Sequence, residues 1–217
     1  MRDDDLYSLI VAGILKPSAP AIETRDYEFR IEHTRLPFRP VNHSQVGVSQ
    51  DDVAVVATLP LKTLIPIRNL KSLYAELCKL IINATSDVSI INPYFDADGR
   101  TKILPYLKAA VNRGVGIRVI SRGAKSLSGR NQAASFLRPL LKERTHDVEL
   151  RSFQVAQRAP VHAKVLISDS ISAYVGSANL TGRSLANNLE VGVVLTGPSV
   201  SIFRKLFDHL WLLSSKS

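Results

Sequence analysis

Polar residues between positions 162 and 190 are of the types that can handle a phosphate group. His162 and Lys164 lie two residues apart in a stretch, 161–168, whose apolar residues predict a strand. Alternation along a strand directs both side chains to the same face. An imidazole beside an ammonium is a poor structural pair, because each disfavours positive charge on the other. Phosphate suits both groups: the lysine can hold a non-bridging oxygen, and the imidazole can supply a nitrogen nucleophile.

Four further residues follow at positions that would complete such a site. Gly176 permits close backbone approach, and the Ser177 hydroxyl and Asn179 amide can donate to phosphate oxygens. Glu190 begins a predicted strand between two apolar residues, so its carboxylate needs a partner. An imidazole N–H is the natural one, and we therefore expect Glu190 to orient the ring of His162.

Each of these residues also has a purely structural interpretation. Gly176 can form a bulge, Asn179 can occupy a turn, and Glu190 can be half of a surface ion pair. A single histidine on a strand is most often part of the core or the surface. The functional interpretation therefore depends on the order and spacing of the whole set of residues.

This spacing resembles the HKD signature of the phospholipase D superfamily. Seven positions match it: His162, Lys164, Asp169, Gly176, Ser177, Asn179 and Glu190. The segments 179–184 (NLTGRS) and 92–95 (NPYF) also look like that family. The likeness covers about residues 85–213.

The resemblance implies a role for each matching polar residue. His162 would attack phosphorus and form a covalent phosphohistidine. Lys164 and Asn179 would bind the phosphate oxygens with help from Ser177, and Glu190 would orient and polarise His162.

Asp169 matches the aspartate of the motif, but it lies past the end of the strand that carries His162. This position favours a structural or orienting role. The resemblance also implies chemistry without a metal or another cofactor. The sequence fits, since it shows no carboxylate cluster and no His/Cys ligand set.

The family's site uses two histidines, whereas this chain carries one motif. Its other histidines have no lysine two residues later: His33, His43, His146 and His209. We therefore expect a two-fold homodimer that brings two copies of His162 together. In this respect the chain resembles the small single-motif nucleases of the superfamily, which are homodimers.

The elements that must position these residues alternate between helices and strands. Apolar periodicity predicts helices over 68–84, 101–112, 131–144 and 199–213, and strands over 87–95, 115–121, 148–153, 161–168, 173–177 and 190–195. This order predicts an α/β sandwich with a mixed central sheet flanked by helices. Ligands of such sheets tend to sit at the carboxyl ends of strands.

Residues 1–67 have little periodicity and are predicted to form an irregular extension to a catalytic domain at 68–217. Asp5 can cap a short helix, and 53–58 (VAVVAT) predicts a strand. The extension and the segment 54–66 loosely resemble phospholipase-D-like components of bacterial anti-phage and restriction systems. Protein partners from such a system are therefore one expectation.

The 217 residues carry a formal charge of +9, distributed unevenly. Residues 1–67 hold 7 Lys/Arg and 9 Asp/Glu, whereas 68–217 hold 21 and 10. A basic domain favours nucleic acid as its partner, and an anionic membrane surface second. Arg122, Lys125 and Arg130 lie in a Gly/Ser-rich loop that can follow a nucleic-acid backbone.

The sequence leaves three functions open: a DNA or RNA nuclease, which is favoured, a phospholipase acting on anionic lipids, or a non-catalytic nucleic-acid-binding module of a defence complex. One cysteine excludes an internal disulfide framework, and no apolar run is long enough to span a membrane. The acidic start lacks the basic region of a secretory signal. We therefore expect a cytoplasmic protein.

Overall fold

The computed structural model describes residues 15–17, 29–31, 50–60, 67–122, 132–141, 148–155 and 159–216. The chain divides into two compact units, Met1–Gly47 and Val48–Ser217. In the first, β1 (Leu15–Pro17) and β2 (Phe29–Ile31) form an antiparallel pair. The helix predicted to begin at Asp5 lies outside the described residues.

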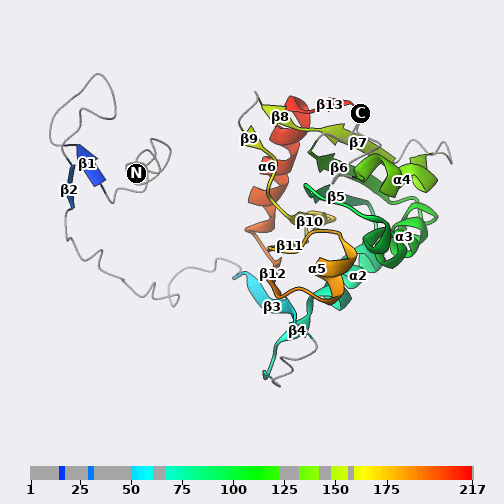
Figure 1. Cartoon of the computed structure of the whole chain (residues 1–217), viewed down its shortest axis with the longest axis horizontal. Coiled ribbons are helices and arrows are strands. Elements are labelled where there is room, and N and C mark those ends of the chain that lie inside the picture. Colours follow the sequence, from blue (N-terminus) through cyan, green and yellow to red (C-terminus); the bar gives the residue numbers. More distant parts are fainter. Residues whose placement is uncertain are drawn as a thin grey trace. The chain divides into compact units, whose positions relative to one another are not determined.

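Within the described part of the second unit, nine strands form one mixed sheet in the order β13-β7-β6-β5-β10-β11-β12-β3-β4 (Figure 1). Their bounds are β3 (Asp52–Thr58), β4 (Lys71–Ser72), β5 (Asp87–Ile91), β6 (Gly116–Ser121), β7 (Val148–Ser152), β10 (Val165–Ser168), β11 (Ser172–Gly176), β12 (Glu190–Thr196) and β13 (Ser215–Lys216). Strands β5, β6 and β7 are parallel, whereas β10, β11, β12 and β3 continue the sheet in antiparallel pairs. A separate pair consists of β8 (Gln154–Val155) and β9 (Ala159–Pro160).

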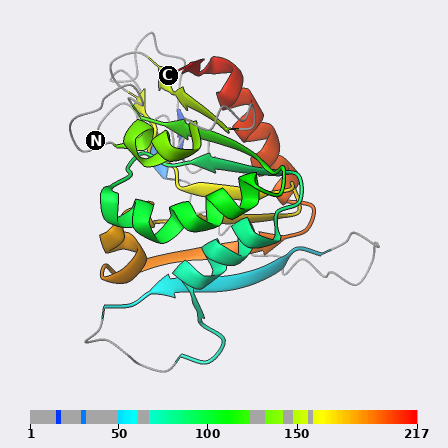
Figure 2. The same cartoon turned by 90° about the vertical axis from the view of Figure 1, so that its right-hand side faces the viewer.

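Helices cover both faces of the sheet. They are α2 (Leu73–Asn83), α3 (Ala97–Val111), α4 (Ala133–Leu141), α5 (Gly182–Ala186) and α6 (Val200–Leu213). Figures 1 and 2 show α2, α3 and α4 together on one side, with α6 on the other. Two buried clusters separate accordingly, since Leu166 and Tyr174 pack with α2 and α3, whereas Val165 and Ile167 pack with α6. Alternation along each strand explains the division.

The helices begin and end where local chemistry dictates. Ser72 caps α2, where its Oγ accepts from the amide of Ala75, and Leu73, Leu77 and Ile81 bury one stripe of that helix. The helix α3 begins earlier than predicted, because Asp96 caps it.

The predicted α/β sandwich is confirmed, but the sheet extends into the region that we assigned to the N-terminal extension. The predicted strand at 53–58 corresponds to β3, which pairs with β12 over seven residues. The compact unit therefore begins at Val48 and not at residue 68. The physical reason is that β12 would be left with an unpaired edge without β3, and β3 satisfies this edge with a full ladder of backbone hydrogen bonds.

Candidate active site

One edge of the sheet collects the polar residues predicted to act on phosphate. The register pairs Val165 at the start of β10 with Ile91 at the end of β5, and Gly176 at the end of β11 with Gly192 on β12. The carboxyl ends of β5, β6, β7 and β11 therefore meet the amino ends of β10 and β12. Residues 162–164, 177–179 and 190 all lie at this edge, which we call the site edge.

His162 and Lys164 lie side by side immediately before β10. The Lys164 Nζ is 3.3 Å from Nδ1 and 3.2 Å from Nε2 of His162, so it contacts both ring nitrogens instead of aligning with one. It also donates to the His162 carbonyl oxygen at 2.7 Å. The imidazole is exposed, whereas the lysine is 8% exposed. The shared face predicted for this pair is therefore present, although the ladder of β10 begins one residue later.

The buried ammonium of Lys164 is poorly solvated. Burial lowers its pKa, and the nearby negative charge of Glu190 partly opposes that effect. Water reaches this ammonium poorly, and an anionic ligand at the site edge would supply the negative charge that pairs with it.

Glu190 has a different partner from the one predicted. Its Oε2 accepts from the Ser177 hydroxyl at 2.5 Å, and its Oε1 accepts from Asn188 Nδ2 at 3.5 Å. Ser177 is placed for this by the sheet, since its amide donates to the Val191 carbonyl and its Oγ accepts from the Val191 amide. Among the described contacts, the carboxylate is thus bonded to Ser177 and not to the imidazole of His162.

A shallow depression of about 570 Å³ opens at the site edge. His162, Lys164, Ser177 and Asn179 line it together with valines of β10, β11 and β12. The Asn179 Oδ1 is buried and has no hydrogen-bond partner among the described residues. These four side chains supply a nucleophile, a cation, a hydroxyl and an amide around one space.

Gly176 is required for a reason that the sequence did not reveal. A Cβ at this position would lie 2.3 Å from the Tyr174 hydroxyl and 2.8 Å from the Gly192 Cα. The close approach is therefore to a phenol inside the protein. Sequence reasoning missed Tyr174, because a buried tyrosine on a strand looks like any core residue.

Asp169 lies at the opposite edge of the sheet, beyond the far end of β10. Its carboxylate accepts from the backbone amides of Thr85, Ser86 and Asp87 and from two of their hydroxyls. Burial raises the pKa of this carboxyl, but these donors outweigh it and hold the pKa well below its usual range. Asp169 therefore ties the β10–β11 turn to the start of β5, which is a structural role, and it does not line the depression.

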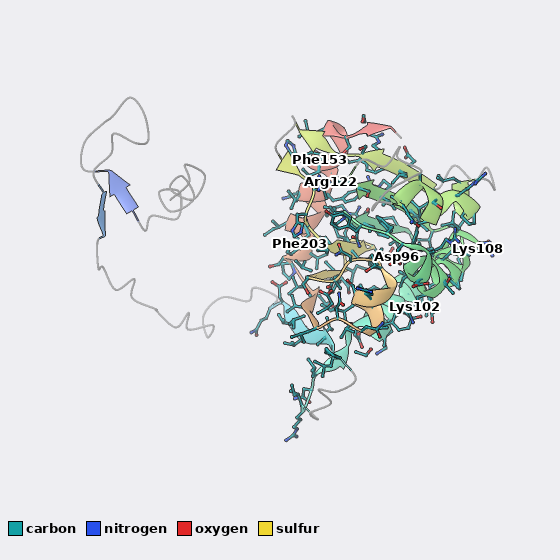
Figure 3. The ribbon with its side chains drawn as sticks, in the orientation of Figure 1. Asp96, Lys102, Lys108, Arg122, Phe153 and Phe203 are labelled. Carbon is teal, nitrogen blue, oxygen red and sulfur yellow. The ribbon has the colours of Figure 1, made fainter. Side chains whose placement is uncertain are left out.

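The basic loop is described in part. Arg122 follows β6 at the site edge, is exposed, and lies 3.3 Å from the Tyr94 hydroxyl, to which its Nη1 donates. Figure 3 shows Arg122 beside Phe153, which follows β7. Lys125 and Arg130 lie outside the described residues. His209, on an exposed position of α6, is absent from the lining of the depression.

In the described part of the chain, no helix is long and apolar enough to cross a membrane. The same residues contain no group of three or more His, Cys, Asp or Glu side chains placed to hold a metal ion.

Solved structures with the same fold include two small proteins. The phospholipase D family member Nuc from Salmonella typhimurium superposes with a TM-score of 0.60 at 20% identity, over 77% of this chain and 99% of its own. NucT from Helicobacter pylori gives 0.59 at 15% identity, over 77% of this chain and 100% of its own. These likenesses show the fold.

Curated relatives are similar in sequence. Cardiolipin synthase B of Escherichia coli is 35% identical over 118 residues, which is 54% of this chain and 27% of the relative. A probable cardiolipin synthase of Bacillus subtilis is 33% identical over 129 residues, 59% of this chain and 24% of the relative. The chain thus spans about a quarter of the length of these relatives. The model of one family, described as cardiolipin synthase, PLD-like domain, matches residues 77–211. The chain therefore belongs to this family of the phospholipase D superfamily, whose members act on phosphodiester bonds.

Proposed function

We propose that this chain is a nuclease that cleaves phosphodiester bonds through a phosphohistidine, without a metal ion. The observation that carries the proposal is an exposed imidazole, His162, in contact with a buried ammonium, Lys164, at the wall of an open depression. The imidazole is reachable by a phosphodiester, and the ammonium lies where negative charge would develop.

The reaction has two balanced steps. A ring nitrogen of His162 forms a bond to phosphorus, the bond from phosphorus to the leaving oxygen breaks, and that oxygen takes a proton from an imidazolium. Water then attacks phosphorus and gives its proton to the second imidazole, the one that protonated the leaving oxygen. The nitrogen–phosphorus bond breaks, which releases a phosphomonoester and restores His162. Lys164 and the Asn179 amide hold the phosphate oxygens. The Ser177 hydroxyl donates its one proton to Glu190 in the structure, so it joins them by turning this proton from the carboxylate to a phosphate oxygen.

The second imidazole comes from the partner subunit's His162 in a homodimer. Among the residues that line the depression, His162 is the one histidine, yet the reaction needs both a nucleophile and an acid. A two-fold axis that passes beside the site edge brings the two rings together.

An uncovered apolar face lies next to the depression. Val53 and Val55 of β3 are 52% and 47% exposed, and they pair with Leu195 and Val193 on the α6 side of the sheet. Val191 of β12 is 52% exposed on the same side and also lines the depression. Since this face is continuous with the site, a second copy packed on it would set its own depression beside the first.

This arrangement predicts the effect of one charged substitution. Val55→Glu is expected to convert the dimer to monomer and to remove activity, because it buries a charge at the interface. Ile82→Glu is the matched control, since Ile82 is 46% exposed but lies on α2, across the sheet. Sedimentation at micromolar concentration measures both. A Val55→Glu protein that stays dimeric would place the interface elsewhere.

Nucleic acid is favoured as the substrate by the excess positive charge in residues 68–217. The size of the chain also fits the small single-motif nucleases that it resembles in sequence, since its fold accounts for nearly the whole length of the small proteins Nuc and NucT. A specific observation favours a phospholipase as the second candidate, namely the match to the cardiolipin synthase family.

A substrate panel separates the two candidates. Purified protein in EDTA is offered labelled single- and double-stranded DNA, RNA, and vesicles of phosphatidylglycerol. We expect cleavage of nucleic acid that weakens steeply with salt, because phosphate contacts release counterions. Lipid turnover without nucleic-acid cleavage would replace the proposal by the phospholipase, and dependence on added magnesium or manganese would overturn the metal-free mechanism.

A further inference from the structure

The segment 177–182 carries two of the phosphate-binding side chains and is fixed at both ends. Ser177 is tied to β12, where its amide donates to Val191 O at 3.0 Å. Leu180 forms an isolated parallel bridge with Phe95, just before α3. Asn179 lies between these points, and among the described residues its buried Oδ1 has no partner. Its position is therefore set by its neighbours and not by that oxygen.

Tyr174 supports the segment from beneath. The amide of Ala178, which is 1% exposed, donates to the Tyr174 Oη at 3.2 Å, and the tyrosine is itself 2% exposed. Gly176 and its cross-strand neighbour Gly192 leave room for the phenol ring, since a Cβ on either would lie within 2.5 Å of Tyr174 atoms. Burial raises the pKa of Tyr174 to about 12, so the hydroxyl stays neutral at ordinary pH.

Asp96 fixes the far end of the segment. Its Oδ1 accepts from Gly99 N at 2.6 Å, capping α3, and from Gly182 N at 2.9 Å, at the start of α5. Figure 3 shows Asp96 where these two helices approach each other. The contact is tight, because a Cβ on Gly99 would lie 2.1 Å from Leu180 O and one on Gly182 would lie 2.3 Å from the Asp98 Cβ.

We propose that Tyr174 and Asp96 are positioning residues, which together hold segment 177–182 in the shape that presents Ser177 and Asn179 to the phosphate. This inference rests on the proposed phosphodiesterase reaction, but it does not depend on which phosphodiester is the natural substrate. Its tests therefore use a small chromogenic aryl phosphodiester.

Tyr174→Phe keeps the ring under the two glycines and removes the oxygen that Ala178 N–H needs. The expected result is a kcat lower by about ten- to a hundredfold, because small misplacements of a group at a reacting centre have effects of this size. KM should change by less than about twofold, since the loss is confined to the transition state.

A double-mutant cycle tests whether Tyr174 acts through Asn179. In an Asn179→Ala background, Tyr174→Phe should lower kcat by less than about twofold, because the side chain being positioned is already absent. Additive losses would overturn the proposal and show a general loss of structure.

Asp96 offers a conservative rescue. Asp96→Asn retains a side-chain oxygen that can accept from both glycine amides, so its kcat should stay near wild type, whereas Asp96→Ala should lower it. Equal losses in the two variants would overturn the capping role.

A matched control separates positioning from stability. Ser168 is buried, and its Oγ donates to Leu80 O at 2.9 Å at the opposite edge of the sheet. Ser168→Ala should lower the thermal midpoint and leave kcat unchanged.

If no diester is cleaved, the proposed function fails while the positioning remains testable through tungstate, an oxyanion that mimics the trigonal-bipyramidal phosphorus of the transition state. Tyr174→Phe should then weaken tungstate binding several-fold by calorimetry. Unchanged affinity would overturn the inference.

Discussion

His162→Ala is expected to abolish phosphodiester cleavage while leaving the fold and the proposed dimer intact. The ring is exposed, so its removal leaves no cavity. Its loss removes the atom that bonds to phosphorus, and the rate constant should fall by about 10⁴ or more. Steady-state assays in EDTA measure the rate, and circular dichroism together with sedimentation reports on the fold and the dimer.

The covalent step supplies a sharper readout. Rapid quenching of wild-type turnover should trap acid-labile, base-stable phosphate on His162. His209→Ala is the matched control, since His209 is exposed on α6 and does not line the depression. It should retain both the rate and the trapped phosphate. Full activity of His162→Ala, or quenching that traps no phosphohistidine, would disprove this mechanism.

The second large effect is on stability. Asp169→Asn should lower the free energy of unfolding by about 3 kcal/mol, because the carboxylate accepts five hydrogen bonds and hydrogen bonds to charged groups are strong. Asparagine also tolerates the positive φ of 52° at this position, so the substitution isolates the carboxylate. Urea denaturation at pH 7 measures the difference.

The same carboxylate makes stability depend on pH. Since its folded-state pKa lies below the unfolded value of about 3.9, protonation favours unfolding. The stabilisation is therefore complete above about pH 5 and is lost as the pH falls towards the folded-state pKa. Asp169→Asn should lack this component of the acid transition. Equal stability of the two proteins at pH 7 would contradict the assignment, and activity per folded molecule should not change.

Local pattern was enough to predict most of the second unit. The strands at β5, β6 and β7 appear where apolar runs predicted them, and alternation correctly placed His162 and Lys164 on one face. These features depend on residues close together in the chain.

The remaining features depend on partners distant in the chain. Nothing in the segment 53–58 shows that it pairs with β12, more than 130 residues later, so the predicted boundary at residue 68 was wrong. The carboxylate of Glu190 was expected to bond the imidazole, but the cross-strand register brings Ser177 closer. The bond from the Ala178 amide to Tyr174 requires a particular turn after β11, which no periodicity reveals.

The short strand β10 separates two kinds of selective constraint. At its amino end, His162 and Lys164 line the depression, and at its carboxyl end Ser168 and Asp169 lock the turn against α2 and β5. Mutations at the first end should alter turnover with little effect on the lifetime of the folded state, and mutations at the second should do the reverse. A directed-evolution library confined to the loops of the site edge can therefore explore new phosphodiester substrates without lowering the free energy of unfolding of the scaffold.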